Sequence, residues 1–385
     1  MIHSFGARNY FSFAEGMEVS FELNSKVPKE FSRGLKASTV LGVKGANGSG
    51  KTNVLKALAF LADFITDSFS HDEKEPIKVE NFFRNDKPTD FYVNFELAAT
   101  KYYYELTLDK DRVMREALYK KVQRKTLVFE RKNNEVVRRP VEHTELDIIE
   151  LKSTASLVST MHKYKLKSAT KDLGEIWEFF YRIWGNVTSS GPVSDEKLFS
   201  RLTATEFYAS APEALAFAKK IICQSDLGIV DIILHKNENA KGDIEHFPLF
   251  VHDVKGEQRV LSSYQESSGT MALYRKLGVY WCALHEGGVL IMDEFDVNCH
   301  PMLLPQMISL FEDPEVNIGN AQFIFTAHNA DIIDELGKYR TILVVKEDNE
   351  SFCYRIDQIP GDIIRNDRSI AALYREGKLG GVPKL

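Results

Sequence analysis

The stretch "GVKGANGSGKTNVLKAL", residues 42–58, decides the fold. The apolar and β-branched run "ASTVLGV" (37–43) predicts a buried strand that leads into it, and the apolar spacing after Thr52 predicts a helix. Between them stands the complete pattern G-x-x-x-x-G-K-[ST], formed by Gly45, Ala46, Asn47, Gly48, Ser49, Gly50, Lys51 and Thr52. In such a loop, backbone N–H groups surround phosphate oxygens, the lysine reaches the β and γ phosphates, and the threonine hydroxyl binds Mg²⁺. The strand–loop–helix context favours a phosphate-binding loop (P-loop), which kinases, GTPases, motor ATPases and transporters share, over a chance glycine-rich turn.

A second motif, "GGVLIMDEFDVNCHP" (287–301), lies near the C-terminus. Its four apolar residues, 289–292, predict a central parallel strand. Asp293 would then stand at the carboxyl end of that strand, where ligands bind in open α/β sheets. This is the Walker B arrangement, in which Asp293 helps to hold Mg²⁺ and Glu294 orients the attacking water. An acidic pair at a strand end is often only solvated, but the intact P-loop favours the functional interpretation.

The segment "AQFIFTAHNADIID" (321–334) predicts another buried strand that ends just before His328. A single histidine in this place is usually structural. Because it follows a Walker B strand, its position matches a switch histidine that hydrogen-bonds the γ-phosphate.

The stretch "YQESSGTMALYR" (264–275) lies 24 residues before Asp293, counted from Gly269, and precedes a helix expected from about Met271 to His285. The order P-loop, long insertion, Ser-x-Gly before a helix, Walker B and histidine resembles the ATP-binding-cassette (ABC) ATPases. The resemblance implies that Ser267 and Gly269 bind the γ-phosphate held by a partner subunit, with help from the positive end of the helix. The alternative is that Ser267 only caps the helix.

Other segments of the sequence resemble one branch of these ATPases. The loop "GANGSGKTN" and the opening "SFGARNYFSF" (4–13) are similar to SMC, RecF and OLD proteins. "MDEFDVNCHP" and the ending "LYREGKLGGVPKL" (373–385) look like ATPases of bacterial anti-phage and abortive-infection systems. The resemblance covers residues 1–60 and 205–385, with Tyr10 in place of the first Phe of that branch's Asn-Phe-x-Ser-Phe turn. Ser268 and Thr270 stand where the Leu-Ser-Gly-Gly-Gln signature of transporter subunits has Gly and Gln.

This resemblance implies an α/β ABC-ATPase head with a mixed sheet, an antiparallel β-subdomain and a helical insertion. It also implies ATP and Mg²⁺ as cofactors and a homodimer or higher oligomer with composite sites. OLD proteins append a nuclease domain, whereas only 57 residues follow His328, so a separate effector chain, a nuclease or toxin, is expected. The alternative function is a RecF- or SMC-like DNA-maintenance ATPase.

The middle of the chain is less informative. Residues 90–129 alternate as antiparallel strands, and an apolar stripe from Leu173 to Val187 predicts a helix. A capping box is expected at Ser210–Glu213, and two strands near 228–235 and 247–252. We expect an N-terminal lobe at 1–139, a helical insertion at 140–205 and a C-terminal lobe at 206–385. The glutamine of the Q-loop cannot be assigned.

Composition limits the remaining possibilities. The net charge is −6, yet residues 112–139 hold ten basic and three acidic residues, either a solvated face or a nucleic-acid contact. The four cysteines are scattered, without a C-x-x-C pair, which predicts free thiols. The absence of a signal pattern and of a long apolar run predicts a cytoplasmic protein without membrane contact.

Overall fold

The computed structural model describes residues 1–25, 27–164, 170–193, 203–225, 228–238, 242, 244–297, 299–360, 364 and 369–382. Within these ranges, no helix combines the length and the apolar composition that a membrane span requires.

The P-loop strand lies inside a mixed six-stranded core sheet of order β18–β17–β3–β16–β15–β9. Only β18 runs antiparallel to its neighbour. The strands are β3 (Val40–Gly45), β9 (Ile183–Gly185), β15 (Val289–Met292), β16 (Gln322–Thr326), β17 (Thr341–Glu347) and β18 (Glu350–Arg355). The two predicted central strands are confirmed as the fully buried β15 and β16. Because β3, β15 and β16 are parallel, the segments that follow them meet at one edge of the sheet.

An antiparallel sheet of order β2–β1–β4–β5–β6–β7–β8 forms the second layer, as the alternation predicts. Its strands are β1 (Ile2–Arg8), β2 (Met17–Ser20), β4 (Thr89–Leu97), β5 (Thr100–Leu108), β6 (Val113–Lys121), β7 (Lys125–Lys132) and β8 (Glu135–Arg138). The helices α2 (Lys51–Asp67), α3 (Leu157–Tyr164) and α4 (Thr170–Tyr181) complete this lobe. The apolar side of α2 packs on the sheet through Phe60, whose ring stacks on Phe91 and Phe64. This packing fixes the helix whose first turn closes the P-loop.

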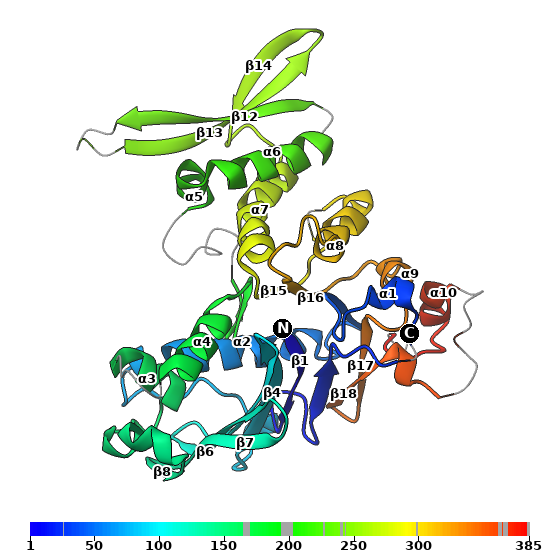
Figure 1. Ribbon diagram of the computed structural model, residues 1–385. Helices are drawn as coiled ribbons and strands as arrows, with labels where there is room; N and C mark the ends of the chain where they lie inside the picture. The colour runs from blue at the N-terminus through cyan, green and yellow to red at the C-terminus, as the bar shows by residue number, and fades with distance from the viewer. Residues whose placement is uncertain are drawn as a thin grey trace.

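A second lobe stands at the opposite end of the molecule (Figure 1). It contains α5 (Ala204–Ser210), α6 (Pro212–Ser225), α7 (Ser268–Glu286) and a three-stranded sheet of β12 (Ile229–Glu238), β13 (Ile244–Val254) and β14 (Glu257–Ser262). The ring of Tyr274 on α7 packs against Tyr208 and Phe250, which joins the helices to the sheet. The helix α7 leads back from this lobe to β15.

Shorter elements surround the core sheet. They are α1 (Lys29–Ser32), α8 (Leu304–Glu312), α9 (Ile332–Leu336), α10 (Ile370–Arg375), β10 (Val187–Thr188) and β11 (Gly191–Pro192).

The helix expected to reach Val187 ends at Tyr181, and Ile183 to Gly185 form the edge strand β9 instead. Gly185 passes so close to β15 that a Cβ there would lie 2.2 Å from the carbonyl oxygen of Ile291. Pairing with β15 therefore overrides the helical spacing, because three residues are too few to show a strand period.

The two strands expected near 228–235 and 247–252 are confirmed as β12 and β13, and β14 follows them as a polar, exposed edge strand without apolar alternation. One further expectation is corrected. Ser210 does not cap α6, because it is the last residue of α5 and its hydroxyl donates to the carbonyl of Phe207. The capping box is instead formed by Thr203 and Glu206 at the start of α5.

Candidate functional site

The P-loop is built for glycine at its turns. Gly45, Gly48 and Gly50 all have positive φ, of 159°, 75° and 108°. A Cβ on Gly50 would lie 2.7 Å from the hydroxyl of Ser12 and 2.8 Å from that of Ser351. The loop is therefore clamped between the β1–β2 turn and β18, a support that the motif alone does not reveal.

The remaining loop residues either brace the loop or form its tip. Asn47 and Gly48 are exposed at the tip, and the backbone N–H of Ser49 donates to the carbonyl of Ala46 at 3.1 Å. The Lys51 ammonium donates to the carbonyls of Gly45 and Ala46 at 2.9 and 3.0 Å. Lys51 thus reaches across the loop in which phosphates are expected.

Burial lowers the pKa of Lys51, and the carboxylates of Asp293, Glu294 and Asp296 oppose this shift. A phosphate anion in the loop would favour the charged lysine still further.

The two predicted metal ligands lie side by side. The Thr52 hydroxyl donates to Asp293 Oδ2 at 2.9 Å, although the two residues are 241 positions apart. Asp293 is 6% exposed, and its Oδ1 accepts a hydrogen bond of 2.5 Å from the Thr326 hydroxyl. A carboxylate and a hydroxyl are hard oxygen ligands of the kind that Mg²⁺ prefers, so these residues fit the ion.

Glu294 and His328 stand next to this pair and face solvent. Glu294 has a left-handed backbone (φ 49°), and its N–H donates to the Thr326 hydroxyl at 2.8 Å. Its carboxylate lies 3.4 Å from His328 Nε2, and the two side chains are 59% and 46% exposed. The structure therefore brings together the predicted water-orienting carboxylate and the predicted switch histidine.

Two residues of this site were missed by sequence reasoning. Thr326 joins Asp293 to the backbone of Glu294, and its only signal is its place at the end of a buried strand. Asn186 follows the edge strand β9 and brackets the backbone of Asp293, accepting from its N–H at 2.7 Å and donating to its carbonyl at 3.0 Å. No local pattern links positions 107 residues apart.

The C-terminal ending also reaches the P-loop. The Tyr374 hydroxyl donates to the carbonyl of Gly381 at 2.9 Å, and a Cβ on Gly381 would lie 3.6 Å from the Cα of Gly45. The last residues of that ending, 383–385, lie outside the described part of the chain.

The predicted partner-contacting residues Ser267 and Gly269, called the signature residues from here on, lie apart from these groups. Ser267 is the N-cap of α7 and accepts from the N–H of Thr270 at 3.1 Å, while Gly269 lies in the first turn. The preceding Glu266 is held by His252 of β13 at 2.5 Å. The 19 residues of α7 span about 28 Å, and this helix separates Ser267 from β15 (Figure 1). Ser267 is therefore a helix cap, and it does not share a site with the P-loop of its own chain.

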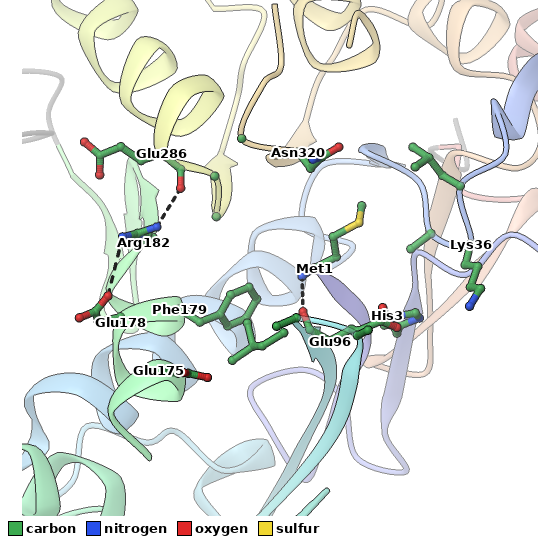
Figure 2. Close-up of a pocket in the computed structure, with 18 of the residues that line it drawn as sticks. Met1, His3, Lys36, Glu96, Glu175, Glu178, Phe179, Arg182, Glu286 and Asn320 are labelled. Carbon is green, nitrogen blue, oxygen red and sulfur yellow. Dashed lines mark hydrogen bonds and ion pairs between the residues drawn. The ribbon is translucent and has the colours of Figure 1, made fainter. Parts of the chain in front are cut away.

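A separate cavity of about 650 Å³ lies beyond the amino ends of the core strands. Figure 2 shows it between Met1, Glu96, Phe179 and the junction of α4 with α7. At that junction the Arg182 guanidinium donates to the carbonyl of Glu286 at 2.9 Å. No predicted site residue lines this cavity, so it is distinct from the nucleotide site.

Comparisons with known proteins give one family match and two similar solved structures. A family model described as "AAA domain, putative AbiEii toxin, Type IV TA system" matches residues 40–334. A search of curated proteins finds no match. Among solved structures, the SMC head domain from Thermotoga maritima is 13% identical, with a TM-score of 0.45 over 94% of this chain and 99% of that chain. The SmcHead bound to the C-winged helix domain of ScpA is 15% identical, with a TM-score of 0.47 over 92% and 96%. The family match spans both halves of the site, from β3 through His328.

Proposed function

This chain belongs to the family of AAA domains described with AbiEii toxins and type IV toxin–antitoxin systems, and from that premise we propose that it binds and hydrolyses ATP as a subunit of a bacterial anti-phage defence module. The observation that carries the proposal is the hydrogen bond between Thr52 and Asp293, which joins the P-loop to the Walker B strand. A site that only bound phosphate would not need the Walker B carboxylates Asp293 and Glu294, which are suited to holding Mg²⁺ and orienting water.

Each residue has a role that its position supports. Lys51 binds the β and γ phosphates once it leaves the loop carbonyls, and the loop N–H groups bind the remaining oxygens. Thr52 and Asp293 would hold Mg²⁺, which neutralises charge on the phosphates. Glu294 orients the attacking water, and His328 donates to the γ-phosphate. The exposure of Glu294 and His328 leaves both side chains accessible to a nucleotide.

Two copies are needed to complete the site. Ser267 and Gly269 lie at the far end of α7, so we propose that they bind the γ-phosphate held by another copy. The helix N-terminus supplies N–H groups and a positive dipole for this contact. The molecule would then close around ATP as a homodimer or a larger oligomer.

The toxin–antitoxin description of the family supports a partner chain, and we propose a separately encoded nuclease or toxin as the effector, acting in the cytoplasm. In this scheme the ATPase is the sensor or scaffold subunit, and the effector carries out the nuclease or toxin activity.

Two variants test the ATPase itself. Glu294→Gln should lower the hydrolysis rate about 10²- to 10⁴-fold while ATP-bound oligomers accumulate, because the water loses its base. Lys51→Ala should lose ATP binding. Phosphate release, equilibrium ATP binding and light-scattering mass measure these outcomes, with the exposed Glu315→Gln as control. Unchanged hydrolysis in both variants would exclude the assignment.

A further inference from the structure

The loop that carries His328 is held from one side by an aspartate of the Walker B motif. Asp296 lies three residues after Asp293, and its Oδ2 accepts from the backbone N–H of His328 at 2.8 Å and of Asn329 at 2.7 Å. Its Oδ1 is buried and has no hydrogen-bond partner among the residues that the structure describes. An unpaired buried carboxylate oxygen is costly, so the order that Asp296 gives to this loop comes at some expense of stability.

A buried lysine holds the same loop from the other side. Lys44 is the residue of β3 just before Gly45, and it is 1% exposed. Its ammonium donates to the carbonyl of Ala327 and, at 2.9 Å, to that of Asn329. Burial lowers the pKa of Lys44 to about 8, while the charge of Asp296 acts in the opposite direction. A methionine would fill this space without a buried charge, so packing alone does not require a lysine.

We propose that Lys44 and Asp296 are positioning residues that fix His328 relative to the nucleotide. Together they bind four backbone groups of residues 327–329 from two sides. Lys44 adjoins the P-loop and Asp296 adjoins the metal-binding carboxylate. His328 is therefore positioned by β3, which leads into the P-loop, and by the turn after β15, which carries both Asp293 and Asp296. A shift of either segment would move His328. This inference rests on the proposed ATPase function.

Hydrolysis by single and double variants tests the inference. Lys44→Met and Asp296→Ala should each lower kcat at least tenfold, with the Kd of a non-hydrolysable ATP analogue changed less than twofold. His328→Ala should have an effect of similar size. Because Lys44 and Asp296 act through His328, adding either change to His328→Ala should cost no further activity. The exposed Lys121→Met and Asp86→Ala serve as matched controls and should keep the wild-type rate.

Hydrogen exchange without nucleotide gives an independent readout. The amides of His328 and Asn329 should exchange at least tenfold faster in Asp296→Ala, with the thermal midpoint little changed, and remain slow in Asp86→Ala. Absence of hydrolysis by the wild-type chain would overturn the proposed function. Hydrolysis by the wild type together with unchanged exchange, or with losses that multiply in the double variants, would overturn this inference alone.

Discussion

The P-loop edge of the core sheet and the N-terminal end of α7 differ in how their polar groups are satisfied. At the P-loop edge, Thr52, Asp293 and Thr326 bond to one another across the interior of one chain. At the end of α7, the Ser267 hydroxyl accepts from the N–H of Thr270 in its own first turn, and the Ser267 N–H donates to the carboxylate of the preceding Glu266. Tyr264, three residues earlier, is 94% exposed. Folding of one chain therefore assembles the first region, whereas the second is complete as a cap, and the nucleotide role that we propose for it requires another chain.

Mixing two inactive variants is the most demanding test of this comparison. Asp293→Ala should lower hydrolysis about 10³-fold because it removes a proposed metal ligand. Ser267→Arg should lower it as strongly while ATP binding to the monomer is kept. In a dimer that mixes at random, half of the dimers combine both variants and hold one intact site of two. The mixture should therefore recover about a quarter of the wild-type rate.

The control for this experiment is the chain that carries both Ser267→Arg and Asp293→Ala. A dimer of two such chains has no intact site and should stay inactive. Phosphate release from the purified chains at increasing mixing ratio provides the measurement. If the single-variant mixture is no faster than its components, the signature region does not act on another chain. Normal hydrolysis by Ser267→Arg alone would reduce Ser267 to a helix cap.

The buried charge of Lys44 makes a pH-dependent contribution that belongs to the P-loop region alone. Its pKa is about 8 in the fold against an ordinary 10.5, so between these values the unfolded chain retains a proton that the folded chain has released. Raising the pH through this window should increase the free energy of unfolding by at most about 3 kcal/mol more in wild type than in Lys44→Met. Denaturant unfolding of both proteins from pH 7.5 to 10 measures the difference. Parallel pH profiles would show that Lys44 does not titrate in this window.

Two glycines sharpen the comparison at a smaller scale. Gly50→Ala should cost about 1–3 kcal/mol in the monomer and weaken ATP binding, because its φ is 108° and the added Cβ meets Ser12 and Ser351. Gly269→Ala should not lower monomer stability, since alanine favours a helix by up to about 1 kcal/mol over glycine. It should slow hydrolysis about tenfold if a phosphate must approach that backbone. Denaturant unfolding and hydrolysis, measured on both variants, separate the effect on monomer stability from the effect on activity. Equal losses of stability in the two variants would contradict the difference proposed between the two regions.

The contiguous parts of the fold and site could be read from the sequence. The eight P-loop residues stand between a strand and a helix that their own apolar spacing reveals, and Asp293 directly follows a buried strand. The features that could not be predicted depend on the pairing of strands that lie far apart in the sequence. Asn186 follows a strand of three residues, and it reaches Asp293 only because β9 pairs with β15. Such contacts leave no spacing in the sequence.

The sequence was also ambiguous where two segments carry the same capping-box pattern. Thr203–Glu206 and Ser210–Glu213 both satisfy the capping-box pattern, but only the first forms the box. Ser210 belongs to the end of α5, where its hydroxyl bonds backward along the chain. Which pattern forms therefore depends on where α5 begins and ends.

The basic segment 112–139 carries the smallest expected effect. Six of its ten cations form ion pairs with nearby acids, namely Arg115, Lys120, Lys125, Arg131, Arg138 and Arg139. Replacing Arg124, Lys125, Arg138 and Arg139 by Glu should leave ATP hydrolysis within about twofold, because exposed ion pairs contribute little. Retention of DNA and RNA at low salt should likewise not change. A large, salt-dependent loss of retention would instead favour a nucleic-acid ATPase and would add a third functional region to the two compared here.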